Sequence, residues 1–158
     1  MAIRSIRTEG DPVLRKHCRK VTELTPKLAE LIEDMLETMY ENNGVGLAAP
    51  QVGVLRNIVV IDVDEEPNPL VLINPEILEF SGEQTGDEGC LSIPGKAGVV
   101  TRPDYVKVQA MDENMESFVL EGTELLARAI CHECDHLQGT LYIDKVEGEL
   151  KDVVHEEE

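Results

Sequence analysis

The sequence predicts a single domain that combines helices with strands. Two segments, at about 26–41 and 124–138, carry apolar residues three and four positions apart, which is typical of helices with one buried face. Short apolar or alternating runs between them are typical of strands: 57–63, 70–73, 77–80, 99–102, 105–111 and 117–121. A chain of 158 residues is long enough to bury a core. We therefore expect residues 1–158 to form one domain, with an acidic tail from about 147 to 158 that is frayed or solvated.

The charge and composition argue against several classes of protein. The formal net charge is −18, which argues against direct nucleic-acid binding and against docking on an anionic membrane. No window approaches the roughly 20 apolar residues of a membrane span, and the first residues lack the apolar core of a signal peptide. We therefore expect a cytoplasmic protein whose four cysteines are thiols or metal ligands rather than disulfides.

The N-terminal third is predicted to contain extended and helical segments. Ile3–Ile6 is predicted to be a short edge strand, and Asp11-Pro12 to open a helical turn that runs to about Cys18. Thr25 followed by Pro26 is typical of a helix start, with a capping residue before proline at the first helical position. The apolar stripe of this helix predicts core packing and no further function.

The predicted strands differ in how much of each we expect to be buried. Ile58–Ile61 is apolar throughout, so we expect both of its faces to be covered. Tyr105–Ala110 alternates between polar and apolar residues, which suits a sheet with one face in water. Ser81–Asp87 is polar and is predicted to be a loop.

The stretch 131–136, Cys-His-Glu-Cys-Asp-His, contains the pattern His-Glu-x-x-His within the second helix. His132 and His136 are one turn apart, so both imidazoles can bind one metal ion. Glu133 is rotated by about 100° from His132. Its carboxylate would therefore lie beside the metal, where it can take a proton from a water molecule. The structural alternative is a pair of hydrogen-bonded core histidines, which would leave a buried glutamate between them in need of a partner.

Two further stretches are candidates for the same site. A catalytic metal site needs a third protein ligand, and Cys90, beside glycine and close to serine, can supply it. A free cysteine is most often a small buried apolar residue, so the two histidines are what favour the ligand role. Residues 44–53 combine glycines and small apolar residues with Gln51, and they predict a tight buried loop. A phosphate-binding loop is disfavoured because its lysine and hydroxyl residue are missing.

These three motifs together resemble the peptide deformylases. The family pattern G-x-G-L-A-A-x-Q corresponds to Gly44–Gln51, E-G-C-L-S to Glu88–Ser92, and H-E-x-D-H to His132–His136. The resemblance covers nearly the whole chain. It implies an α+β fold in which antiparallel or mixed sheets pack around the C-terminal helix with the His-Glu-x-x-His motif. It also implies a hydrolase that removes the formyl group from the N-formylmethionine of new polypeptides and releases formate.

The resemblance implies how the reaction centre is built. Three residues would bind the metal: Cys90, His132 and His136. Glu133 would act as general base and then as general acid. The Gln51 side chain and the backbone N–H of Leu91 would stabilise the developing oxyanion.

Other residues would bind the substrate or support the site. Four residues would bind the substrate: Val45, Gly46, Leu125 and Ala129. The first two would pair with the extended peptide as an added strand, and the last two share the histidine face of the helix and would line a pocket for the methionine side chain. Glu88, paired with Arg102, would orient the Cys90 loop without touching the metal.

The cofactor would be one divalent metal ion. Three protein ligands leave a position open for water, which is typical of a catalytic site. Two nitrogens and one sulfur are compatible with Fe²⁺ or Zn²⁺, and the resemblance implies Fe²⁺ in the cell, replaceable by Zn²⁺, Ni²⁺ or Co²⁺. The partners would be N-formylmethionyl nascent peptides. The enzyme would act as a monomer, in transient proximity to the ribosome.

The chain departs from the commonest family pattern at a few positions. Cys131 stands where glutamine is usual and Cys134 at a variable position, and both are expected to face away from the ligands. The acidic tail differs from the basic C-terminal helix through which some relatives dock on the ribosome.

Two other functions remain alternatives. A zinc metallopeptidase would need a third ligand downstream, where only His155 follows His136. A non-enzymatic, zinc-stabilised domain would need Cys131 or Cys134 as a fourth ligand.

Overall fold

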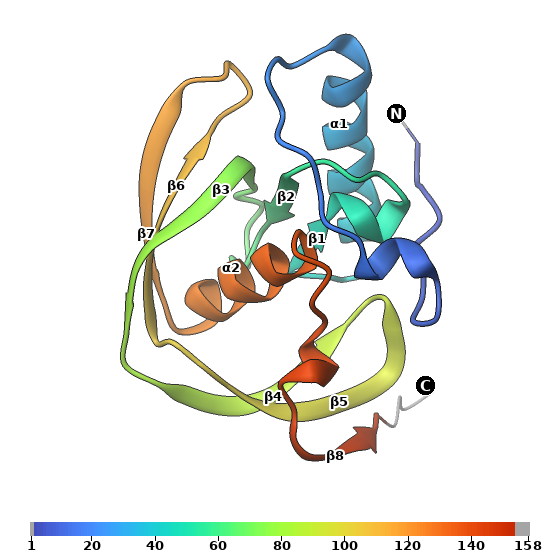
Figure 1. Ribbon diagram of the computed structural model, residues 1–158, viewed down its shortest axis with the longest axis vertical. Coiled ribbons are helices and arrows are strands. Elements are labelled where there is room, and N and C mark those ends of the chain that lie inside the picture. The colour runs from blue at the N-terminus through green and yellow to red at the C-terminus, as the bar shows by residue number, and fades with distance from the viewer. Residues whose placement is uncertain (1, 154–158) are drawn as a thin grey trace.

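The computed structural model describes residues 2–153 and has two antiparallel sheets around one helix, α2 (Figure 1). The five-stranded sheet has the order β1-β2-β3-β6-β7 and the three-stranded sheet the order β4-β5-β8. The strands are β1 (Gly46–Ala48), β2 (Ile58–Ile61), β3 (Leu70–Ser81), β4 (Gln84–Cys90), β5 (Ile93–Arg102), β6 (Tyr105–Met111), β7 (Ser117–Thr123) and β8 (Glu147–Asp152). The helices are α1 (Pro26–Glu41), α2 (Glu124–His136) and the short 3₁₀ helices η1 (Pro12–Arg15), η2 (Ala49–Val52) and η3 (Tyr142–Asp144). The predicted α+β fold is confirmed.

Helix α1 begins where the sequence predicts. The Thr25 side chain accepts a hydrogen bond from the Leu28 backbone N–H at 3.2 Å, and Pro26 occupies the first turn. The helix ends at Glu41, before Asn42. Its apolar stripe is buried, as predicted.

The five-stranded sheet separates two apolar cores. In β2, Val59 and Ile61 pack in the core that contains α2, whereas Ile58 and Val60 pack in the core that contains α1. Successive residues of a strand point to opposite faces, so the two helices cover opposite faces of this sheet. This confirms that both faces of the strand are covered. Strand β6 has one row of buried side chains, as its alternation predicts.

Helix α2 lies in the centre of the molecule, between the two sheets (Figure 1). Its Ala127 and Ile130 pack against the five-stranded sheet. Thr123 occupies the N-cap position, but its side chain makes no capping hydrogen bond. No helix in the described part of the chain is both long and apolar enough to cross a membrane.

Two segments differ from the prediction near the start and middle of the chain. Ile3–Ile6 is extended but forms no strand, because neighbouring backbone N–H groups bond to side chains of α1 instead: that of Ala2 to Asp34 and that of Arg4 to Thr38. The segment 81–87, predicted to be a loop, supplies the end of β3 and the start of β4. β4 is polar because much of it is exposed, and its backbone pairs with β5.

The tail also differs from the prediction. Instead of fraying from about residue 147, Glu147–Asp152 forms β8, which pairs with β5. All six residues are exposed, and two exposed ion pairs join the strand to its neighbours: Lys151 with Asp87 at 2.7 Å and Lys96 with Asp152. Residues 154–158, with His155, lie outside the described residues.

Candidate metal centre and substrate cleft

Three potential metal ligands meet between α2 and the end of β4. Ligand atoms of Cys90, His132 and His136 all lie within 4.8 Å of one another. Cys90 Sγ is 3.4 Å from His136 Nε2. Both histidines are buried and Cys90 is half-buried. One thiol and two imidazoles at this separation fit a divalent metal such as Fe²⁺ or Zn²⁺.

Glu88 orients one of the two histidines. Its carboxylate is 2.6 Å from His132 Nδ1. Arg102 donates to both Glu88 oxygens, at 3.1 and 2.6 Å, and Arg128 donates to Oε1 at 2.8 Å. Burial opposes the charge of Glu88, which is 6% exposed, but the hydrogen bonds from His132 and Arg102 lower its pKa to about 2. An ionised carboxylate only accepts hydrogen bonds. His132 Nδ1 therefore donates, and its Nε2 lone pair is left for a metal.

The Glu133 carboxylate lies against the backbone of β1. A Cβ atom added to Gly46 would lie 2.5 Å from Glu133 Oε2, so only glycine leaves room for the carboxylate here. Glu133 is 4% exposed, and its Oε1 has no hydrogen-bond partner among the described residues. Burial raises the pKa of Glu133 to about 7. A carboxylate with such a pKa is suited to both accepting and returning a proton near neutral pH.

Gln51 and Leu91 lie beside the same centre. Gln51 Oε1 accepts from the Ala48 backbone N–H at 2.9 Å, which fixes the direction of the amide. Gln51 Nε2 then faces Ser92 Oγ at 3.0 Å and Cys90 Sγ at 3.5 Å. The Leu91 backbone N–H takes part in no hydrogen bond within the described chain.

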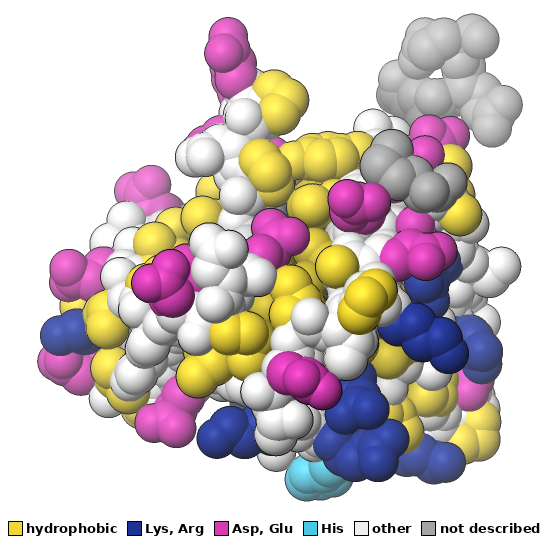
Figure 2. Space-filling model, turned by 90° about the horizontal axis from the view of Figure 1, so that it is seen from above, with side chains coloured by type: hydrophobic (Ala, Val, Ile, Leu, Met, Phe, Trp, Pro, Cys, Tyr) yellow, Lys and Arg dark blue, Asp and Glu magenta, His cyan; other side chains and the backbone are white. Residues whose placement is uncertain are grey.

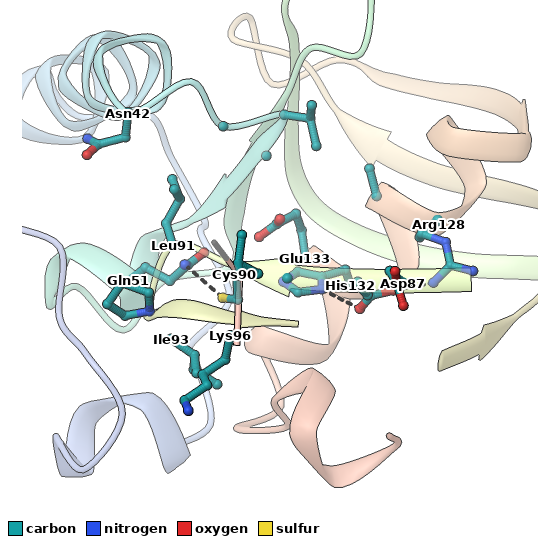
Figure 3. A pocket seen from close by; sticks show the side chains of 18 of the residues that line it. Asn42, Gln51, Asp87, Cys90, Leu91, Ile93, Lys96, Arg128, His132 and Glu133 are labelled. Atoms are coloured by element: carbon teal, nitrogen blue, oxygen red, sulfur yellow. Dashed lines mark hydrogen bonds and ion pairs between the residues drawn. The ribbon is translucent and has the colours of Figure 1, made fainter. Parts of the chain in front are cut away.

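A cavity of about 510 Å³ opens onto this centre, and Figure 3 shows the side chains around it. It is bounded by β1, the β4–β5 hairpin and α2. Val45 and Leu125 are exposed at 42% and 47%, whereas Gly46 and Ala129 are buried in its wall. All four predicted substrate-binding residues therefore line one cavity.

The other predicted residues divide into two groups. Those that line the cavity are Gln51, Glu88, Cys90, Leu91, His132 and Glu133. His136 and Arg102 are not in the cavity wall. Cys131 and Cys134 pack in the apolar core and are not part of the ligand triangle, so the described residues form no closed four-ligand site.

Three supporting residues were not predicted. Arg128 donates to Glu88 and to the Val100 carbonyl, Asp135 accepts from Arg102 at 2.7 Å, and Ser92 faces Gln51. Arg128 could have been found, because it precedes His132 by four residues and so lies on the same side of the helix. Asp135 and Ser92 stand at fixed positions of the family patterns H-E-x-D-H and E-G-C-L-S, but their partners Arg102 and Gln51 are distant in the chain and could not be assigned from the sequence.

Comparison with known families identifies the chain. A family model described as polypeptide deformylase matches residues 3–152. This chain belongs to the polypeptide deformylase family. A peptide deformylase of Agathobacter rectalis is 69% identical over 157 residues, which cover 99% of this chain and 98% of the relative. One from Lachnoclostridium phytofermentans is 61% identical and covers 100% of this chain and 98% of the relative.

Solved deformylase structures have the same fold. The crystal structure of the Thermotoga maritima peptide deformylase matches with a TM-score of 0.88 and 42% identity, over 92% of this chain and 99% of that one. The Synechococcus elongatus enzyme, solved in complex with actinonin, matches with a TM-score of 0.86 and 46% identity, over 90% and 78%.

The family membership establishes the activity. Deformylases are metal-dependent hydrolases that remove the N-formyl group from nascent polypeptides, so the predicted function is confirmed. The alternative of a zinc metallopeptidase is not supported.

Proposed function

We propose that this deformylase binds one divalent metal ion through Cys90, His132 and His136 and uses Glu133 to move the proton. The observation that carries the proposal is the triangle of ligand atoms, all within 4.8 Å of one another, beside a buried carboxylate. A metal bound there would polarise the formyl carbonyl and make a nearby water molecule a stronger acid.

The protein groups would then divide the work of hydrolysis. Glu133 would take a proton from the attacking water as oxygen adds to the formyl carbon. Gln51 Nε2 and the Leu91 N–H would donate to the developing oxyanion. Gln51 Nε2 lies 3.5 Å from Cys90 Sγ, so this donor is beside one of the proposed ligands. Glu133 would return its proton to the peptide nitrogen as the C–N bond breaks, giving formate and a free amine.

The peptide would lie along β1. Within residues 2–153 this strand is at the edge of the five-stranded sheet and pairs with β2 alone. Its other edge, with Val45 just before it, can therefore pair with an extended substrate at Val45 and Gly46. Ala129 and the apolar stem of Leu125 would contact the methionine side chain. Glu88, held by Arg102 and Arg128, would orient His132.

We also propose the identity of the metal and the setting of the reaction. The N₂S ligand set and the family favour Fe²⁺ in the cell, with Zn²⁺, Ni²⁺ or Co²⁺ as substitutes. The chain would act in the cytoplasm, where nascent peptides are formylated, in transient proximity to the ribosome. It would act as a monomer of one domain, because residues of a single chain supply the ligands and line the cavity.

A formate-release assay tests the proposal. The protein is loaded with Fe²⁺ or Ni²⁺ without oxygen and given a formyl-Met peptide, with the unformylated peptide as control. We expect formate in proportion to bound metal, from the formylated peptide alone. Cleavage of an internal peptide bond, or equal formate release by the metal-free protein, would contradict it.

A test of the pocket uses Ala129→Phe. The larger side chain would project from the wall and occupy part of the cavity. We therefore expect KM for formyl-Met peptides to rise or turnover to fall, while metal content stays the same. Kinetics identical to those of the parent for both formyl-Met and formyl-Ala peptides would place the pocket elsewhere.

A further inference from the structure

A group of basic side chains lies outside the cavity, and we refer to it as the cationic patch: Lys16, His17, Arg19, Lys20 and Arg56. The first four are exposed and Arg56 is half-buried. Figure 2 shows Lys and Arg side chains gathered near a histidine at one edge of the molecule. His17 is the exposed histidine of residues 2–153. None of the five residues lines the substrate cavity.

The patch lacks the carboxylate partners that other basic residues have. Eight of the fourteen Lys and Arg residues form ion pairs with described Asp or Glu residues. The six without such a partner within residues 2–153 are Lys16, Arg19, Lys20, Lys27, Arg56 and Lys145. Four of these six belong to the patch. In a chain with 32 acidic residues, this local excess of positive charge stands out.

The backbone holds two of these cations side by side. Arg19 and Arg56 pair in an isolated parallel bridge, with hydrogen bonds from Arg19 N to Leu55 O at 3.1 Å and from Asn57 N to Arg19 O at 2.9 Å. Like charges on paired backbone positions repel each other. A bound anion would relieve this repulsion. The neighbouring Cys18 N–H bonds to Leu137 O at 3.0 Å, which anchors the loop to the end of α2.

We propose that the cationic patch binds the phosphate backbone of RNA. Guanidinium groups match the geometry of phosphate oxygens, and several such contacts in a row suit a polyphosphate chain. The net charge of −18 does not prevent this, because charges farther apart than the Debye length of about 8 Å are largely screened at physiological ionic strength. The acidic remainder of the surface would instead confine the contact to the patch. This inference departs from our expectation, drawn from net charge, of no direct nucleic-acid contact.

Two observations favour RNA over an anionic membrane. The patch residues lie in the segments 15–24 and 53–57. None of the large apolar side chains that are exposed in residues 2–153 belongs to these segments, so they offer no exposed apolar anchor for a lipid interface. The family's substrates are nascent polypeptides, and these emerge from a particle rich in RNA. A patch away from the cavity could hold the enzyme near this source while the cavity stays free.

A matched pair of double variants tests the inference. Arg19→Gln/Lys20→Gln removes two patch cations, and Lys27→Gln/Lys145→Gln removes two cations that also lack ion-pair partners but lie outside the patch. Binding of a fluorescent single-stranded RNA is measured by anisotropy as salt is raised from about 50 to about 200 mM. For the patch variant we expect the slope of log K against log salt to fall by about 1.4, since each phosphate contact contributes about 0.7, and affinity at low salt to fall roughly tenfold or more. The control variant should bind like the parent, and both should deformylate a formyl-Met peptide normally.

Several outcomes would overturn the inference. It is wrong if the parent protein fails to bind RNA at about 50 mM salt, or if the patch variant binds as tightly as the parent. Equal losses in both double variants would show a response to total charge rather than to the patch. Patch-dependent binding to phosphatidylserine vesicles, without binding to RNA, would identify a membrane as the partner. Because deformylation is measured in the same samples, a failure of the catalytic account would be seen separately.

Discussion

The two sheets that enclose α2 hold it by different kinds of contact. Against the five-stranded sheet, α2 packs through aliphatic side chains such as Ala127 and Ile130. Against the three-stranded sheet, it is held by a buried charged network of Glu88, Arg102 and Arg128. Apolar packing is non-directional, whereas hydrogen bonds to a carboxylate fix the angle of each partner. The first sheet therefore positions the helix, and the second sets the orientation of His132.

We expect the largest loss of activity when the proposed metal ligand on the three-stranded sheet is removed. Cys90→Ala removes the proposed ligand that β4 supplies, so we expect the protein to lose its metal and formate release to fall to background. Cys134→Ala is the matched control, because this cysteine packs in the apolar core outside the ligand triangle. Metal content is measured alongside formate. A metal-loaded, active Cys90→Ala enzyme would show that the ligand set is different.

Gly46→Ala tests the close approach of the five-stranded sheet to Glu133. The added Cβ would lie 2.5 Å from Glu133 Oε2 and would push the carboxylate aside. Because misplacement by about 1 Å can cost about 10²-fold, turnover should fall by roughly that factor while metal content stays the same. Turnover equal to the parent's, at full metal occupancy, would mean that the position of Glu133 is not critical.

A smaller effect is expected from Arg128→Met, which weakens the charged network without touching a ligand. Glu88 would lose one of its two guanidinium partners, and His132 would be held less firmly. Changes to such supporting residues typically cost about 10–100-fold in metal affinity or activity. Arg128→Lys, which keeps the charge, should recover part of the loss. If Met and Lys give the same metal affinity as the parent, Arg128 has no positioning role.

We expect the smallest effect on activity from a substitution in the apolar core between α2 and the five-stranded sheet. Leu72 is fully buried in β3. Leu72→Ala should lower the free energy of unfolding by about 2–5 kcal/mol through lost burial and a cavity. Turnover per folded molecule and metal affinity should stay unchanged, as measured by urea unfolding and by kinetics at low temperature. A selective loss of metal without a loss of stability would contradict the division of roles.

The same division explains what the sequence could predict. Four strands of the five-stranded sheet, β2, β3, β6 and β7, were predicted from apolar or alternating residues, because that pattern directly reflects burial. β1 was not, because the short run of small residues in 44–53 predicted a tight loop. β4 and β8 were not predicted, because they are polar and exposed and so carry no burial pattern, and β8 pairs with β5, a strand much earlier in the chain. Local patterns carry no information on such pairs. The site motifs were recognisable because metal ligands require particular residue types at particular spacings.

The charged network was predicted only in part. The pairing of Glu88 with Arg102 is present, at 2.6 Å. The prediction placed Glu88 only as a support for the Cys90 loop. In the structure its carboxylate also contacts His132 Nδ1 directly. Arg128 was overlooked because an arginine on a helix is usually exposed, and its burial becomes clear only when the two sheets are seen on either side of α2.

The central claim is that a metal held by three residues works with Glu133 as the proton carrier. Glu133→Gln tests it most directly, because the amide keeps the shape of the side chain and cannot act as a base. Parent and variant are loaded with metal under the same anaerobic conditions, and metal content and formate release are measured on the same samples. We predict one metal ion per chain in both proteins and a loss of about 10²–10⁴-fold in turnover for the variant. Near-normal turnover at full metal occupancy would contradict the account.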